Sequence, residues 1–298
     1  MAKVQDAATP DWDADLQVYE PHRAGLPKFR PYFRDLRARL PFAAEFSRSG
    51  IKAAHSQTVF GQLWLALNPL LLALVYYILV NIISPTQGGM AYFAHIVGGL
   101  FVFFYVSGSI SAGAGSVIGG GRLILNMAFP RLLMPLAAVR TAFFRFLPTL
   151  PLFVIINVIA RIVDPQPGEG PWSFTMLLGL VFLALITVFN VGMAALFAAV
   201  QVYFRDTTSF LPYFLRIWLY LSPVLWFIDQ AVDRFGDVTS WMLLNPLFSL
   251  IGGWTDLTLR GQVPEPEIWI VAAAWAGLAL VLGSLFFMSR ERDFAVRI

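Results

Sequence analysis

Long apolar stretches alternate with short polar segments along the chain. A helix that crosses a membrane needs about 20 mostly apolar residues, because the hydrocarbon core is about 30 Å thick. Six stretches meet this requirement, over about 62–83, 93–118, 132–163, 174–202, 208–228 and 268–288. None contains Asp or Glu, although the whole chain has 18 such residues. The pattern predicts an all-α integral membrane protein, with a six-span transmembrane domain over residues 62–298.

The third stretch is too long for one straight crossing. It contains Arg140 and Arg145, followed by Pro148 and Pro151. Proline interrupts helices, because it lacks a backbone N–H and its ring collides with the preceding turn. We therefore expect a tilted or two-part helix whose first turns lie at the membrane surface.

A seventh apolar segment, Trp241 to Leu259, is interrupted by Asn245, Pro246 and the pair Gly252-Gly253. With six spans, 17 of the 21 Lys and Arg residues lie on the side of both chain ends. The positive-inside rule assigns that side to the cytoplasm, and a seventh crossing would move the basic C-terminal tail outside. The segment is therefore predicted as a re-entrant pair of short half-helices before the last span, on the outer side and buried against protein.

The chain begins with a polar region. Residues 1–28 are acidic and proline-containing, which predicts a flexible cytoplasmic tail. Residues 29–61 are predicted to hold amphipathic interface helices. Between Phe29 and Leu40, apolar residues recur at helical spacing and arginines cover the remaining surface, as in helices that lie on an inner leaflet. A simple positive-inside anchor predicts the same location. The expected interface residues are Phe33, Arg34, Leu36, Arg37 and Leu40.

Composition narrows the function. With 58% hydrophobic and only 13% charged residues, the chain is neither a soluble enzyme nor a nucleic-acid-binding protein. It has no cysteine and only three scattered histidines, so we expect no metal site. The sequence contains no phosphate-binding loop, no G-x-S-x-G elbow and no H-E-x-x-H motif, so it is not expected to be catalytic alone. Transport driven by ions usually needs a carboxylate within a span, and the predicted spans contain none. Any pumping would therefore need energy from another chain.

Small residues recur every four positions in the second span, at Gly108, Ala112, Ser116 and Gly120. This spacing favours close packing between two helices. A direct role in contacting substrate is the alternative.

Arg216 is the clear charge in the middle of a span, where an arginine without a partner is costly. It either binds backbone carbonyls at a broken helix or faces a hydrated path, where its planar fork could hold a pyrophosphate. Aromatic residues make up 15% of the chain. Most are expected to face lipid or the core, although aromatic faces also suit stacking on sugar rings. The candidate translocation path consists of Phe210, Tyr213, Phe214 and Arg216.

Three stretches together resemble a known family. In the segment from His55 to Pro69, polar residues lead through Gly61 and Trp64 into the first span. This segment resembles the entry to the first span in ABC-2 type permeases that export polysaccharides. The other two stretches are Tyr203 to Asp206 with the following Leu221 to Val224, and the ending Phe294 to Arg297. The resemblance covers about residues 30–298.

The resemblance implies a channel-forming subunit of an ATP-driven exporter in the bacterial plasma membrane, with both termini cytoplasmic. Its substrate would be a lipid-linked cell-surface polysaccharide of the O-antigen, capsule, teichoic acid or galactan kind. Two copies would form the channel above two copies of a separate ATPase, which would hold ATP and Mg²⁺; no cofactor is expected on this chain. The long tail and the abundance of Ala and Arg favour an actinobacterial galactan exporter.

The resemblance also implies roles for particular residues. The contact with the ATPase would lie on a short cytoplasmic helix between spans two and three, at Arg122, Leu123, Ile124, Leu125, Asn126 and Phe129. The outer gate would be the half-helices, with Trp241, Asn245, Pro246, Gly252, Gly253 and Trp254. Two alternatives stay open: a drug or small-lipid efflux permease of the same plan, and a passive channel or scaffold.

Overall fold

The computed structural model describes residues 26–54, 63–83, 89–165, 174–228, 236 and 239–298. All regular elements in these ranges are helical, which confirms the all-α prediction. The long helices are α3 (Trp64–Ile83), α4 (Met90–Gly119), α6 (Leu133–Phe146), α7 (Thr149–Val163), α8 (Thr175–Tyr203), α9 (Thr207–Leu221) and α13 (Pro266–Arg290). The others are α1 (Phe29–Ala38), α2 (Leu40–Ala54), α5 (Gly121–Asn126), α11 (Thr239–Met242), α12 (Pro246–Thr255), the π-helix η5 (Asp256–Arg260), the 3-10 helix η6 (Glu291–Asp293) and α14 (Phe294–Arg297).

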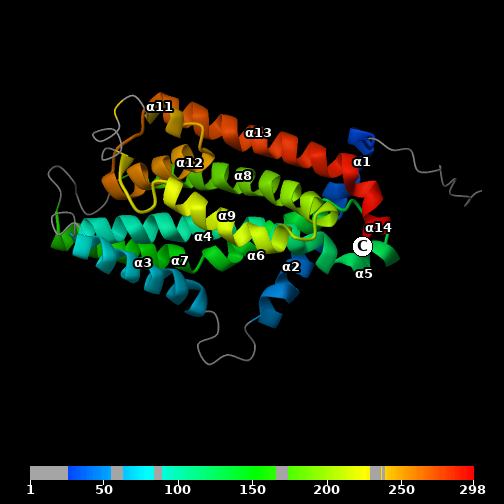
Figure 1. The fold of residues 1–298 in the computed structure, drawn as a ribbon, viewed down its shortest axis with the longest axis horizontal. Helices are drawn as coiled ribbons and strands as arrows, with labels where there is room; N and C mark the ends of the chain where they lie inside the picture. The colour runs from blue at the N-terminus through cyan, green and yellow to red at the C-terminus, as the bar shows by residue number, and fades with distance from the viewer. Residues whose placement is uncertain (1–25, 55–62, 84–88, 166–173, 229–235, 237–238) are drawn as a thin grey trace, which may run out of the picture.

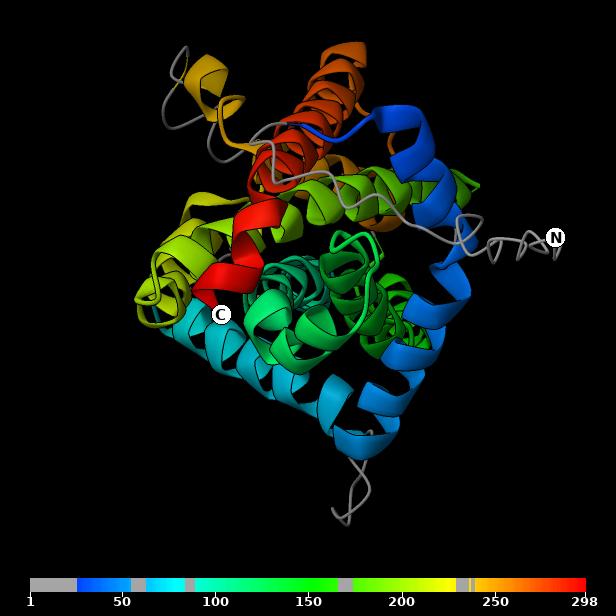
Figure 2. The same cartoon turned by 90° about the vertical axis from the view of Figure 1, so that its right-hand side faces the viewer.

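The long helices lie side by side along one axis, as Figure 1 shows, with α5 and α14 at one end and α11 and α12 toward the other. In the view along this axis, α4 lies near the centre, whereas α3 and α13 lie at the periphery (Figure 2). Burial agrees, because 78% of the apolar window of α4 is buried, against 11% for α3 and 22% for α13. The outer helices therefore present their apolar residues to the surroundings, as a bundle in lipid requires.

Within the described residues, five helical stretches are long and apolar enough to cross a membrane. They are Trp64–Ile82, Met90–Gly119, Leu133–Val163, Thr175–Tyr203 and Pro266–Arg297. The predicted two-part third span is found as α6 and α7, which meet at Leu147 and Pro148.

In the fifth predicted span, over 208–228, the helix α9 ends at Leu221. Helix α9 therefore has 15 residues, a length of about 22 Å, which is shorter than a full crossing. Ser222 leaves the helix in an extended conformation and Pro223 follows it. Proline disfavours helical geometry in the residue before it, which accounts for the early end.

Two glycines allow α8 and α13 to approach closely. A Cβ atom at Gly283 would overlap the backbone carbonyl of Gly192, and a Cβ atom at Gly192 would overlap the backbone at Ala279. Contact between two backbones cannot be relieved by a side-chain rotation. This position therefore requires the absence of a side chain on both helices.

The N-terminal helices pack on the bundle at the end that carries α5. Helix α1 ends at Ala38, and α2 begins at Leu40 with Pro41 in its first turn, a position that proline favours. The sequence predicts Leu40 in the first amphipathic helix, but the structure places it at the start of α2. The hydroxyl of Tyr32 donates a hydrogen bond of 2.6 Å to Glu291, and Arg131 donates to the backbone carbonyl of Glu291. These bonds connect α1 to the C-terminal end of the chain.

Candidate functional site

Asn245 joins the end of α9 to the start of α12. Its side-chain oxygen accepts hydrogen bonds from the Leu247 backbone (3.1 Å) and from the indole N–H of Trp218 (2.7 Å). Its amide nitrogen donates to the carbonyl of Leu221 at 2.9 Å. One side chain thus caps the N-terminus of α12 and satisfies a carbonyl that the early end of α9 leaves without a helical partner.

The non-helical segment after α9 is held by side chains from other elements. The Tyr92 hydroxyl donates to the carbonyl of Leu225 at 2.5 Å, and the Nε2 atom of His95 lies 3.2 Å from the carbonyl of Trp226. Both side chains come from α4 and are almost fully buried. Irregular backbone at membrane depth is tolerated only when its polar groups find partners inside the protein, and these contacts supply them.

A second group of bonds holds η5. Arg161, at the end of α7, is only 8% exposed and donates to the carbonyl of Leu259 at 2.9 Å. Asn157 donates to the carbonyl of Thr258 at 2.8 Å. Sequence reasoning missed these roles, because the carbonyls come from a helix about 100 positions later in the chain.

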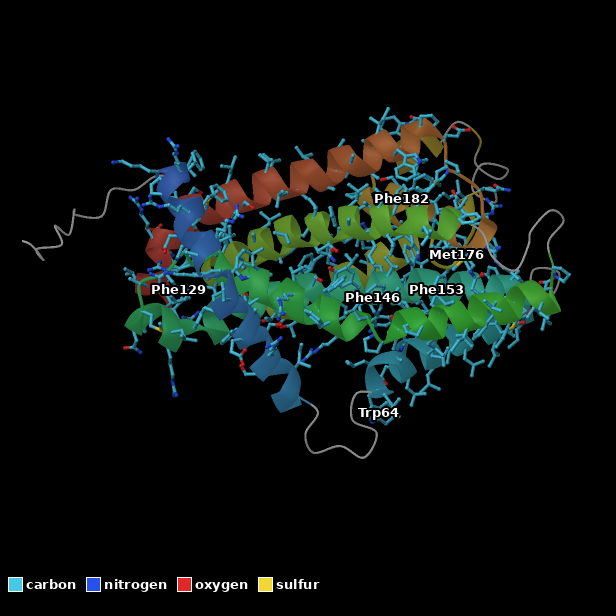
Figure 3. The ribbon with its side chains drawn as sticks, turned by 180° about the vertical axis from the view of Figure 1, so that it is seen from behind. Trp64, Phe129, Phe146, Phe153, Met176 and Phe182 are labelled. Carbon is cyan, nitrogen blue, oxygen red and sulfur yellow. The ribbon has the colours of Figure 1, made fainter. Side chains whose placement is uncertain are left out.

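Some of the predicted outer-gate residues are buried in α12, and others lie at or before its start. In α12, Gly252 faces Ile228, Gly253 faces the ring of Phe182, and Trp254 is buried against Phe153. Figure 3 places Phe153 and Phe182 together in the half of the bundle away from Phe129. Pro246 occupies the first turn of α12, while Trp241 is 73% exposed. The helix runs without a break through the two glycines, so the interruption lies at Leu243–Asn245 instead. Insertion of this helix from the outer side stays a prediction.

The candidate path residues lie on two sides of α9. Phe214 packs inward, with its ring centroid 5.2 Å from that of Trp218 and 6.2 Å from that of Phe197. Phe210 and Tyr213 are 59% and 68% exposed, and Arg216 is also exposed. The structure therefore brings Tyr213 and Arg216 to an outward face, whereas Phe214 is half-buried against the core.

Two tyrosines extend this outward face, and sequence reasoning missed them. The hydroxyl of Tyr76 in α3 lies 3.1 Å from that of Tyr220 in α9, and the two rings meet edge to face. The Arg216 guanidinium lies within electrostatic range of Tyr76. Tyr220 is four residues after Arg216, so helical spacing could have identified it, whereas Tyr76 could be found only from the fold. We call Tyr76, Tyr213, Arg216 and Tyr220 the α3–α9 face.

Some of the residues expected to contact an ATPase are buried on the bundle, and others are exposed. Ile124 is buried, and Phe129 lies after α5 and packs on Phe42 with ring centroids 6.0 Å apart. Leu123 is half-buried, whereas Arg122, Leu125 and Asn126 are exposed. Figure 3 shows Phe129 at the end of the bundle. Helix α5 is therefore anchored by its apolar residues and presents Arg122 and Leu125 outward.

The predicted interface helix does not present one continuous apolar face. Tyr32 and Leu36 are buried on the bundle, whereas Phe33 is 47% exposed and Leu40, in α2, is 46% exposed. Arg34 and Arg37 belong to the same helix, and Arg34 is exposed. Burial raises the pKa of the Tyr32 hydroxyl, and the Glu291 carboxylate raises it further, so this group stays a hydrogen-bond donor. Contact of the exposed arginines with lipid headgroups stays a prediction.

Several known proteins are similar to this chain in sequence, although no family model matches it. An O-antigen export system permease protein RfbA from Klebsiella pneumoniae is 27% identical over 248 residues, which cover 82% of this chain and 90% of the relative. A protein of the same name from Myxococcus xanthus is 28% identical over 247 residues, with the same coverage. The resemblance to ABC-2 type permeases of polysaccharide exporters, which the sequence motifs indicated, is confirmed.

Proposed function

We propose that this chain is the channel-forming membrane subunit of an ATP-driven exporter for a lipid-linked cell-surface polysaccharide. Two copies would assemble with two copies of a separate ATPase in a bacterial plasma membrane, with both termini cytoplasmic. Helix α9, extended by the segment up to residue 228, would be the fifth of six crossings, and α11 with α12 would enter from the outer side. The relatives are named for O-antigen; a galactan substrate stays a prediction.

The α3–α9 face carries this proposal. Arg216 is exposed in the middle of an apolar helix, and an arginine at such a position facing lipid would cost at least about 2.5 kcal/mol. The cost falls if the face borders a hydrated path between two subunits. The neighbouring tyrosine hydroxyls and rings suit a ligand with both hydroxyls and apolar C–H surfaces, as sugars have.

The exposed side of α5 supports a contact with a separate ATPase chain. A solvent-exposed Leu125 (59%) and Met127 (47%) beside Arg122 form an apolar patch with a positive charge at the end of the bundle. Such a combination is typical of a protein contact. The chain contains no phosphate-binding loop of its own, so the nucleotide would bind to the other chain.

We expect Arg122→Glu to reduce copurification of the ATPase subunit by about tenfold or more while the permease still elutes as a dimer. Because Arg122 is exposed, the substitution should not disturb the packing of Ile124. Arg122→Lys keeps the charge and is the matched control. Equal ATPase recovery with Arg122→Glu and with the unmodified chain would place the contact elsewhere.

We also expect a single cysteine at Gln262 to react with an impermeant thiol reagent in intact cells. Cysteines at Asp206 or Ser289 should react only after the membrane is permeabilised. The naturally cysteine-free chain makes each label unambiguous. Labelling at Ser289 in intact cells would require an odd number of crossings and would contradict the proposed topology.

A further inference from the structure

A pocket of about 280 Å³ lies on the side of the bundle, between α3, α4 and the junction of α6 with α7. We call it the lateral pocket; the residues of its wall that matter here are Trp64, Asn68, Gly108, Thr141, Arg145 and Thr149. It is open to the outside, since Asn68 and Trp64 are exposed. Figure 3 shows Trp64 at the same level along the bundle as Phe146, which also lines the pocket.

Arg145 brings an unsatisfied positive charge to the lateral pocket. Its Nε atom is buried and has no hydrogen-bond partner among the described residues. The nearby Arg140 differs, because it donates to the carbonyl of Ala44 at 2.9 Å and lies over the ring of Phe144. No Asp or Glu lines the described wall, and the sequence 55–62 before Trp64 contains neither residue. Arg145 is half-buried, and a buried Nε–H without an acceptor is unfavourable, so the site is suited to an anionic ligand.

The other polar groups of the pocket indicate that a ligand bound there must accept hydrogen bonds. The hydroxyl of Thr149 donates to the carbonyl of Phe146 at 2.7 Å, and that of Thr141 lies 2.8 Å from the carbonyl of Ala137. Their protons are therefore used within the helix, whereas the guanidinium of Arg145 and the amide of Asn68 can donate outward. A phosphate offers several oxygen acceptors to such donors. The apolar remainder of the wall, with Phe101, Phe104 and Leu65, suits a hydrocarbon chain.

The level of the pocket in the bundle matches that of a lipid headgroup. The hydroxyl of Ser47 in α2 lies 2.9 Å from that of Thr141, so the interface helices contact the bundle beside the pocket. Helix α3 begins at Trp64, and tryptophan is enriched where a span meets the membrane surface. The positive charge therefore lies near the depth at which lipid phosphates are found.

Small residues keep this space open. A Cβ atom at Gly108 would meet no atom within 4 Å, and Ala112 of the next turn also lines the pocket. Gly113, in contrast, packs against Ala194 of α8. Within this chain, the first half of the stripe from Gly108 to Gly120 therefore borders a cavity, while its predicted helix packing is not seen at Gly108.

We propose that the lateral pocket binds the phosphate head of an anionic membrane lipid, with Arg145 and Asn68 as donors and the aromatic wall against the lipid chain. Two lipids share this chemistry: an anionic phospholipid and a prenyl diphosphate carrier. The proposal requires only that the chain lies in a membrane and does not depend on what it exports.

Native mass spectrometry of the purified full-length chain tests the proposal. Detergent micelles are doped with phosphatidylglycerol, with a long-chain prenyl diphosphate, or with zwitterionic phosphatidylcholine. We expect one anionic lipid to be retained per subunit, and phosphatidylcholine to be retained about tenfold less. Gly108→Leu places a side chain in the pocket, where its Cβ atom meets nothing within 4 Å, and should reduce retention of the anionic lipid by about tenfold, as should Arg145→Gln. Gly115→Leu is the matched control, because a Cβ atom there also meets nothing within 4 Å but the residue lies outside the pocket wall.

The two anionic probes distinguish the source of the phosphate. Retention of phosphatidylglycerol assigns the site to a phospholipid, and retention of the prenyl diphosphate alone assigns it to the carrier. Equal retention of phosphatidylcholine, or unchanged retention by Gly108→Leu, would overturn the proposal. Since lipid retention is measured without export or ATP, failure here leaves the proposed function untouched.

Discussion

Gly283→Leu is expected to abolish folding of the chain. A side chain at this position would enter the space of the Gly192 carbonyl on α8, and a backbone cannot move aside as a side chain can. Overpacking of a well-packed core costs about 1–3 kcal/mol, and a clash with a backbone belongs at or above the upper end of this range. The measurement is the yield of monodisperse protein in size-exclusion chromatography of a fluorescent fusion after detergent extraction. We expect it to fall by at least about tenfold.

Gly277→Leu is the matched control for this prediction. Gly277 lies in the same helix, and a Cβ atom there would meet nothing within 4 Å. Leucine is also a better helix former than glycine, so this variant should extract and elute like the unmodified chain. Similar yields for the two variants would show that α8 and α13 are not packed backbone to backbone in the folded protein.

The positions of the long helices could be predicted because apolar runs are a local signal. The second and fourth predicted spans, 93–118 and 174–202, agree with α4 and α8 to within three residues at each end. The split of the third span was also local, since Pro148 marks it. Bilayer thickness fixes the length of a span, so a single sequence contains most of this information.

Hydropathy did not predict the end of α9, although Pro223 is a local signal that disfavours helix at Ser222. Residues 222–228 are as apolar as the helix before them, so hydropathy continues through them. What permits the helix to stop is Asn245, 24 residues later, whose side chain binds the freed carbonyl of Leu221. Long-range hydrogen bonds of this kind leave no periodic signal in a sequence.

For the candidate site residues, the sequence shows which residue types are unusual but not which way their side chains point. Arg216 could be recognised as unusual from its position alone, and the structure does place it on an outward face. Phe214, two residues before it, is packed inward against Trp218. Aromatic residues satisfy a lipid face, a core and a sugar path equally well, so only the orientation around the helix separates these roles.

Because Arg216 points outward, we expect Arg216→Leu to reduce export strongly while the chain still folds. The side chain is exposed, so leucine should be accepted without loss of folding. If the α3–α9 face borders the path, removal of the guanidinium removes the positive charge that would hold the pyrophosphate of a lipid-linked sugar. We expect export to fall by at least about tenfold, with unexported glycolipid on the inner face of the membrane.

Two variants make this result specific. Ile217→Leu changes the adjacent residue, which is 60% exposed, and should export normally. Arg216→Lys keeps the charge but loses the planar fork, so it should retain part of the activity, because a point charge binds phosphate less specifically than two parallel N–H groups do. The measurements are surface polysaccharide, inner-face glycolipid and copurified ATPase in the same cells. If Arg216→Leu assembles with its ATPase and exports at the normal rate, Arg216 does not contact the substrate and the α3–α9 face is not the path.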